Sequence, residues 1–198
     1  MKVRDSGMPE RSLWENFFDA PLIIRKLGIN KTIGDVAEFG CGYGTFTIPV
    51  ARQIKGKIYA LDIEPEMIAA TRVLAQEHEL DNVVLIHRDF VLKGTGLPDR
   101  SVDYALLFNI LHLENPVKLL REARRILKTN GLLGMIHWNY DPATPRGPSL
   151  DIRPKPEQCV AWAQKAGFGR PVRYDLKPYH YGIVLCKSRS VMKYVKTK

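Results

Sequence analysis

The chain has 198 residues, of which 45% are apolar and 26% are charged, proportions typical of a globular protein long enough for one domain of ordinary size. No apolar run of about 18 residues occurs, which excludes a membrane-spanning helix, and the N-terminal residues lack the apolar centre of a secretory signal. Three sparse cysteines predict reduced thiols and a cytoplasmic location.

The net charge of +9 is concentrated in the second half of the chain. Residues 101–198 hold 17 Lys and Arg against 7 Asp and Glu, whereas residues 1–100 hold 13 against 14. A basic half could attract nucleic acid or an acidic substrate. We interpret the excess first as a solvated helix face within 118–128 and a basic tail at 187–198.

Strand-like and helix-like segments alternate from about residue 35 to residue 170. The predicted strands are short and almost wholly apolar, and lie at 36–39, 57–62, 83–87, 104–108 and 131–138. The predicted helices lie at 45–53, 65–78, 115–128 and 156–166. Asn115 is the predicted N-cap of the third of these helices, and Gly167 is expected to stop the fourth.

Apolar strands that alternate with helices predict an α/β fold with a mostly parallel sheet and helices on both faces. A hairpin at 172–176 and 181–186 suggests that one edge strand runs antiparallel. We expect a single domain over 1–198, in which N-terminal helices within 1–30 precede a core at 31–186. The Pro-rich stretch 141–156 is predicted to be a loop within this domain.

Three alternating glycines follow the first strand in V-A-E-F-G-C-G-Y-G (36–44). Gly40 lets the chain leave the strand sharply, Gly42 lets a ligand lie against bare backbone, and Gly44 lets the next helix come close. In such a sheet the ligand lies beyond the carboxyl ends of the strands. A dinucleotide and an adenosyl compound are both candidates for this position.

The spacing and the neighbouring acids favour the adenosyl compound. The turn reads G-x-G-x-G, one residue tighter than the dinucleotide pattern, and Glu38 would repel a pyrophosphate but suits an ammonium group. Asp62 could accept hydrogen bonds from ribose hydroxyls, and Asp89 could meet an adenine amino group with Phe90 or Ile63 against the ring. Each acid also has a simpler explanation, as a solvated strand end, a helix cap or a turn residue.

Five blocks in order then resemble the class I S-adenosylmethionine-dependent methyltransferases. They are E-F-G-C-G-Y-G, A-L-D-I-E-P-E-M, R-D-F, S-V-D-Y-A-L-L-F-N-I-L-H-L and L-L-R-E-A-R-R-I-L-K-T-N-G-L-L. The resemblance implies a Rossmann-like seven-stranded sheet in the order 3-2-1-4-5-7-6, with strand seven antiparallel. It also implies that S-adenosylmethionine is bound by Glu38, Gly40, Cys41, Gly42, Gly44, Asp62, Ile63, Asp89, Phe90 and Asn109.

Candidate residues for the methyl acceptor come from the ends of the fourth and fifth strands. His112 could act as a general base or orient the acceptor, but its apolar context also suits a packing histidine. Trp138, Asn139 and Tyr140 are candidates for the acceptor pocket, although Trp138 could equally be part of the core. The aromatic segment 12–27 could cover the cofactor, as leading helices do in the family, or simply pack against the sheet.

The motifs that are missing point to a small-molecule acceptor. The residues after the fourth strand, N-I-L-H, differ from the N/D-P-P-Y/F motif of enzymes that methylate base amines, and no cysteine follows a proline as in cytosine C5 enzymes. No metal-ligand spacing is evident. An RNA or protein acceptor and a non-catalytic binding module remain alternatives, and the sequence does not define an oligomeric state.

Overall fold

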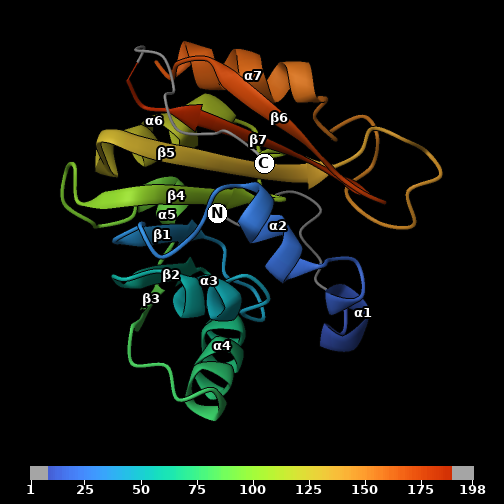
Figure 1. The fold of residues 1–198 in the computed structure, drawn as a ribbon. Helices are drawn as coiled ribbons and strands as arrows, with labels where there is room; N and C mark the ends of the chain where they lie inside the picture. The colour runs from blue at the N-terminus through green and yellow to red at the C-terminus, as the bar shows by residue number, and fades with distance from the viewer. Residues whose placement is uncertain (1–8, 189–198) are drawn as a thin grey trace.

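The computed structural model describes residues 9–188, whose seven strands form one sheet in the order β3-β2-β1-β4-β5-β7-β6 (Figure 1). The strands are β1 (Val36–Phe39), β2 (Ile58–Asp62), β3 (Val83–His87), β4 (Val102–Phe108), β5 (Leu127–Trp138), β6 (Pro171–Leu176) and β7 (His180–Cys186). Strand β7 is antiparallel to both β5 and β6, and the other neighbours are parallel. The predicted strand order and the reversed seventh strand are confirmed.

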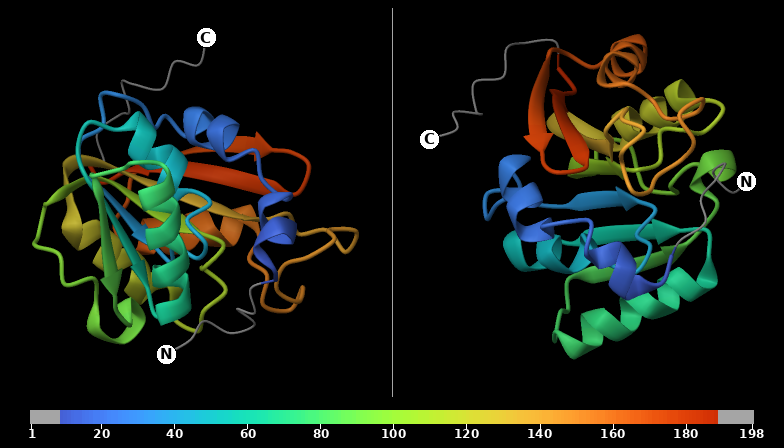
Figure 2. Two further views of the ribbon diagram at one scale, coloured as in Figure 1. Left: turned by 90° about the horizontal axis from the view of Figure 1, so that it is seen from below. Right: turned by 90° about the vertical axis from the view of Figure 1, so that its right-hand side faces the viewer.

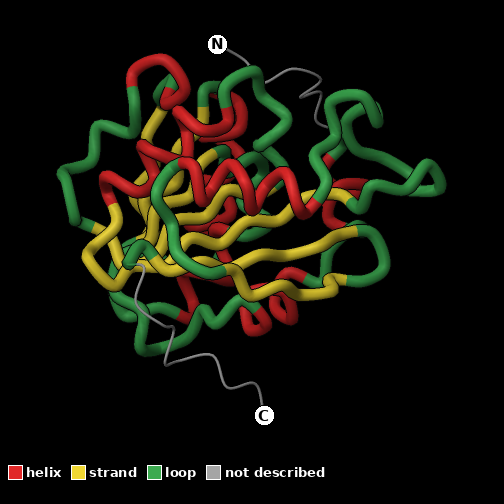
Figure 3. The backbone as a smooth tube through the Cα atoms, turned by 90° about the horizontal axis from the view of Figure 1, so that it is seen from above, coloured by secondary structure: helices red, strands yellow, loops and turns green. Residues whose placement is uncertain are grey.

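Helices cover both faces of the sheet (Figure 3). They are α1 (Arg11–Glu15), α2 (Ala20–Lys26), α3 (Thr47–Gln53), α4 (Pro65–Glu77), α5 (Phe90–Lys93), α6 (Pro116–Ile126) and α7 (Pro156–Lys165). Apolar side chains of α2, α3 and α4 pack on one face, and those of α5, α6 and α7 pack on the other. Strands β1 and β7 are buried along their whole length, as two-sided coverage requires.

Local signals placed most helix ends correctly. The Asn115 side chain accepts a hydrogen bond from the Lys118 backbone N–H at 3.1 Å, as its prediction as an N-cap requires. Gly167 follows α7 with a φ of +98°, a conformation that costs glycine little. The four-residue α5 was not predicted, because one helical turn is too short to show a period.

The carboxyl ends of the parallel strands meet at one edge of the sheet. Helix α1 and the loop that follows β5 both extend beyond this edge (Figures 1 and 2). None of the helices within residues 9–188 has both the length and the apolar character needed to cross a bilayer. Most of the predicted basic tail, residues 189–198, lies outside the described residues, as do residues 1–8 of the N-terminal segment.

Candidate active site

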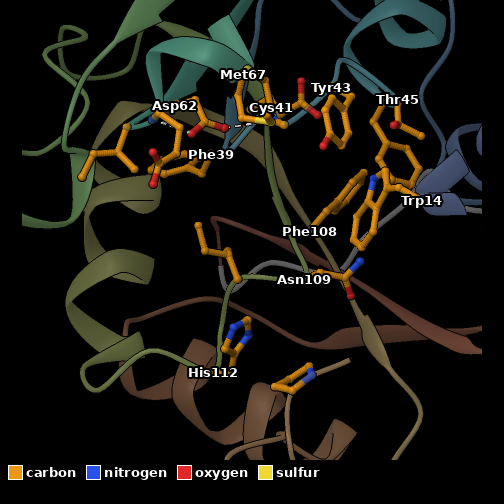
Figure 4. Close-up of a pocket in the computed structure, with 18 of the residues that line it drawn as sticks. Trp14, Phe39, Cys41, Tyr43, Thr45, Asp62, Met67, Phe108, Asn109 and His112 are labelled. Atoms are coloured by element: carbon orange, nitrogen blue, oxygen red, sulfur yellow. Dashed lines mark hydrogen bonds between the residues drawn. The ribbon is translucent and has the colours of Figure 1, made fainter. Parts of the chain in front are cut away.

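A cavity of about 840 Å³ opens at this edge of the sheet, within the usual size range of ligand sites. It is lined by residues from the ends of β1, β2, β4 and β5, from helix α1 and from the loop after β5 (Figure 4). Of the residues predicted to form a site, the lining includes Glu38, Gly40, Cys41, Gly42, Asp62, Ile63, Asp89, Phe90, Asn109, His112 and Trp138. One cavity therefore gathers side chains that lie up to 100 positions apart in the chain.

The glycine turn is held in place by hydrogen bonds from two neighbouring elements. The backbone N–H of Gly42 donates to Asp62 Oδ2 at 2.9 Å, and Thr71 Oγ1 of α4 donates to the Gly42 carbonyl at 2.9 Å. Gly44 has a φ of +85°, and a Cβ there would lie 3.2 Å from Thr71. The helix that comes close at Gly44 is thus α4, rather than the next helix in the chain.

Burial keeps the carboxyl group of Glu38 largely protonated near neutral pH. Glu38 is 2% exposed, and burial raises its pKa to about 8, while the hydrogen bond from Thr47 lowers it and the charge of Asp62 raises it further. Thr47 Oγ1 donates to Glu38 Oε2 at 2.5 Å. A cationic ligand group would stabilise the ionised form of this carboxyl.

The two other predicted acids combine a structural bond with a position on the cavity wall. Asp62 accepts from the backbone N–H groups of Gly42 and Glu64, and burial raises its pKa despite these bonds. Asp89 caps α5, because its Oδ1 accepts from the N–H groups of Val91 and Leu92. Asp62 therefore does not cap α4, whose N-cap is Glu64, whereas Asp89, expected as a turn residue, is an N-cap. Both carboxyl groups still line the cavity, so a binding role is compatible with these bonds.

Asn109 is the most unusual polar residue of the cavity. Its φ is +53°, and both polar atoms of its side-chain amide are buried without a hydrogen-bond partner among the described residues. Buried polar groups in folded proteins are nearly always hydrogen-bonded. Because Asn109 lines the cavity, this unsatisfied amide fits a site whose bound ligand supplies the missing partners.

Aromatic side chains form the wall between the cavity and the N-terminal helices. The ring of Trp138 lies 6.3 Å from that of Trp14 and 5.2 Å from that of Phe17, both in edge-on arrangements. The Tyr43 hydroxyl donates to the Pro9 carbonyl at 2.8 Å, which links the glycine turn to the segment before α1. Trp14 lines the cavity, so α1 does cover one side of it.

A buried arginine organises the loop after β5. Arg153 is 7% exposed, and its guanidinium donates to the carbonyl oxygens of Pro148, Asn139, Asp141 and Arg146 at 2.9 to 3.3 Å. These bonds fold the loop back over Trp138, where a Cβ at position 147 would lie 2.8 Å from the indole. The Pro-rich stretch is therefore an ordered wall of the cavity.

Three predicted site residues lie outside this lining. Gly44 contacts α4, as described above. The Asn139 amide donates to the Pro178 carbonyl at 3.3 Å, and Tyr140 is 44% exposed with the Lys155 ammonium 4.5 Å above its ring. After Trp138 the chain turns away from the cavity, which strand periodicity alone does not indicate.

Sequence reasoning missed several lining residues, including Tyr43, Thr45, Phe46, Glu64, Glu66, Met67, Phe108, Ile110 and residues 145–148. The position of Tyr43 between two glycines of the turn was an available signal. Residues 145–148 gave no such signal, because their place depends on Arg153. Among residues 9–188, no three His, Cys, Asp or Glu side chains are grouped as metal ligands would be.

The strand order, with its reversed seventh strand and a glycine-rich turn facing the cavity, is the architecture of the class I S-adenosylmethionine-dependent methyltransferases. Residues 36–131 match the family model described as a methyltransferase domain. By fold and motifs, the chain contains a methyltransferase domain with the architecture of the class I S-adenosylmethionine-dependent methyltransferases.

The proteins similar to this chain agree on the class but differ in the activities that their names state. A solved S-adenosylmethionine-dependent methyltransferase from Aquifex aeolicus superimposes with a TM-score of 0.76 at 25% identity, covering 90% of this chain and 94% of that one. A demethylmenaquinone methyltransferase of Listeria welshimeri is 31% identical over 105 residues, which are 52% of this chain and 44% of that protein. The catalytic subunit of a tRNA (adenine(58)-N(1))-methyltransferase of Candida albicans is 29% identical over 132 residues, which are 65% of this chain and 38% of that protein. The chain thus spans less than half the length of these two curated relatives.

Proposed function

We propose that this chain binds S-adenosylmethionine in the cavity and transfers its methyl group to a small-molecule acceptor. The observation that carries the proposal is the meeting of the glycine turn, three strand-end acids and the unsatisfied Asn109 amide in one cavity. When bound, S-adenosylmethionine supplies a methyl group on a positively charged sulfur. The part of this chain is to hold and orient the reactants and to exclude water.

The residues present fit the groups of this cofactor. Gly40 and Gly42 expose backbone to the cavity, and Glu38 offers a carboxyl that can ionise beside an ammonium group. A carboxylate has about four lone-pair sites, so Asp62 can accept from ribose hydroxyls in addition to its two backbone donors. Asp89, two residues after β3, would meet the adenine, and the Asn109 amide would bind the methionine portion.

The aromatic enclosure supports a small acceptor. Trp14, Phe108 and Trp138 line the cavity together with the loop that Arg153 holds. A walled cavity of this kind suits a compact, partly apolar molecule better than a base within a folded RNA. The similarity to a demethylmenaquinone methyltransferase is consistent with such an acceptor.

An RNA acceptor is the second candidate, because a tRNA methyltransferase subunit is among the similar proteins and the second half of the chain is basic. RNA affinity should then fall steeply with salt, with a negative log–log slope set by the number of phosphate contacts. A flat salt response would remove this candidate.

Calorimetry with S-adenosylmethionine and S-adenosylhomocysteine tests the binding step. We expect binding by the parent and its loss in Asp62→Ala and in Gly42→Val, with circular dichroism to check that both variants are folded. Asp81→Ala is the matched control. Asp81 is an exposed acid just before the amino end of β3, whereas the cavity lies at the carboxyl ends of the strands. Equal binding by all four proteins would refute the assignment of the cavity.

Tritiated methyl transfer into fractionated cell extract tests the second step. We expect label in the small-molecule fraction. Label in RNA or protein would refute the small-molecule acceptor, and binding without any transfer would identify a non-catalytic S-adenosylmethionine-binding module.

A further inference from the structure

Two histidines are hydrogen-bonded to each other at the β4 and β5 end of the cavity. Nδ1 of His112 lies 3.2 Å from Nε2 of His137, and their rings are nearly perpendicular, at 85°. His112 lines the cavity, whereas His137, in β5, is 1% exposed. One ring must donate in this bond and the other must accept.

The backbone of Trp138 decides which histidine donates. Its N–H donates to Nδ1 of His137 at 3.0 Å, so that nitrogen carries no proton. A neutral imidazole holds a single proton, which in His137 must then be on Nε2 and point at His112 Nδ1. His112 accepts at Nδ1, so its own proton is on Nε2.

The environment of His137 keeps this ring neutral. Burial lowers the pKa of His137 well below its ordinary value, and the neighbouring His112, His180 and Arg153 lower it further. A doubly protonated His137 would also direct an N–H at the Trp138 N–H. Both effects favour the single arrangement of protons described above.

The charges on the cavity wall differ between its two ends. The acids come from the β1, β2 and β3 side and comprise Glu38, Asp62, Glu64, Glu66 and Asp89. Among the described lining residues from β4 onward, His112 and Arg146 are ionisable and no carboxylate is present. Figure 4 shows Asn109 and His112 on the opposite side of the cavity from Asp62.

We propose that His137 is a positioning residue that fixes His112 as a hydrogen-bond donor toward the methyl acceptor, so that the site takes an acidic hydroxyl compound, a phenol or an enol, bound as its anion. The assignment of the acceptor rests on the proposed function; the assignment of the tautomer does not. A Nε2 that already carries a proton cannot take one from the acceptor, so His112 is not a general base.

An anionic acceptor needs no base at the transfer step. A lone pair of the oxyanion, or the carbon conjugated with it, forms the new bond to the methyl carbon. The electron pair of the broken carbon–sulfur bond stays on sulfur, so the negative charge of the acceptor and the positive charge of the sulfonium both disappear. His112 and Arg146 would stabilise the anion before transfer.

Nitrogen-15 NMR of the full chain labelled at histidine tests the tautomer directly, without ligand or turnover. We expect His112 and His137 each to show a protonated Nε2 and an unprotonated Nδ1 at neutral pH. In His137→Phe the tautomer of His112 should no longer be fixed, whereas His137→Gln, whose amide can donate to His112 Nδ1, should restore it. A proton on Nδ1 of His112 in the parent protein would overturn the proposal, whether or not the variants fold.

Two substitutions of His112 separate a donor from a base. Gln keeps an N–H donor, and we expect His112→Gln to lower tritiated methyl transfer by less than about tenfold. Glu can accept a proton but offers no donor when ionised, and we expect His112→Glu to lower transfer by about 100-fold, the upper range for losing a hydrogen bond to a charged group. The reverse order, or loss of transfer in the Gln variant, would overturn the donor role.

If the parent binds S-adenosylmethionine but transfers to no fraction, the proposed function fails while the NMR result stands.

Discussion

Glu38 combines complete burial with a position on the cavity wall. Its pKa rises from the ordinary 4.5 to about 8 because burial disfavours the charged carboxylate. The ligand-free protein therefore holds a proton at Glu38 over a pH range in which the unfolded chain has already lost it. Glu38 should therefore make the free energy of unfolding fall as the pH rises, whereas an ion-paired acid makes it rise.

We expect the free energy of unfolding of the ligand-free protein to fall as the pH rises from about 4.5 to about 8, by about 1 kcal/mol per pH unit from this group alone. Glu38→Gln should lack this contribution while still accepting the hydrogen bond from Thr47. Urea denaturation at pH 5 and pH 8 measures the difference between the two proteins. The same pH dependence in both would contradict a raised pKa at Glu38.

Asn109 illustrates a conflict between stability and binding at one residue. Asn109→Gly removes a buried unsatisfied amide and relieves a positive φ. We expect the free energy of unfolding of the ligand-free protein to rise by about 1 kcal/mol, and the affinity for S-adenosylmethionine to fall in calorimetry.

The matched control is Arg100→Gly, at an exposed residue with the same φ of +53°. Arg100→Gly should relieve backbone strain without changing the affinity. If Asn109→Gly binds S-adenosylmethionine as tightly as the parent, the amide has no role in the cavity.

At the scale of elements, one buried side chain, Arg153, joins the two ends of the loop after β5. Arg153 donates to four backbone carbonyls. That of Pro148 belongs to a buried residue, whereas those of Asn139 and Asp141 also accept from N–H groups of the loop. Backbone polar groups that lose their partners cost about 1–3 kcal/mol each when they stay buried. The loop should therefore open when Arg153 is replaced.

Arg153→Met should make trypsin cleave after Arg146 about tenfold faster or more, because cleavage requires an opened loop. Mass spectrometry of limited digests identifies the site. Arg170→Met, at an exposed arginine elsewhere in the chain, is the control and should leave the rate at Arg146 unchanged. Unchanged cleavage in Arg153→Met would show that other contacts hold the loop.

At the scale of the whole molecule, the cavity joins elements from both halves of the sheet. A ligand that binds only the folded state at 100 times its Kd adds about 2.7 kcal/mol to stability. For a chain of this size we expect S-adenosylmethionine to raise the Tm by about 5–10 °C. Gly42→Val should show no such shift, and an unchanged Tm in the parent would contradict binding at the cavity.

Much of the architecture could be predicted because its signals are local. Strands β1 and β3 begin and end at the predicted residues, and the N-cap at Asn115 was identified from residue type. The single helical turn of α5 and the break between α1 and α2 were not predicted, because neither extends over enough residues to show a period. The glycine turn could be identified because its tight backbone requires glycine at fixed spacing. The acids could be identified because each follows or ends a predicted apolar strand.

The sequence alone determined the alternation of apolar strands and helices, the turn at Gly40 to Gly44 and, by resemblance, the strand order. Tertiary structure alone decided which side chains face one another across the cavity. His112 and His137 meet because β4 and β5 are neighbours in register, and Arg153 finds its four carbonyls only once the loop has closed. Chain periodicity specifies the direction of a side chain within its own element, whereas contacts between elements depend on how the sheet twists and the loops fold.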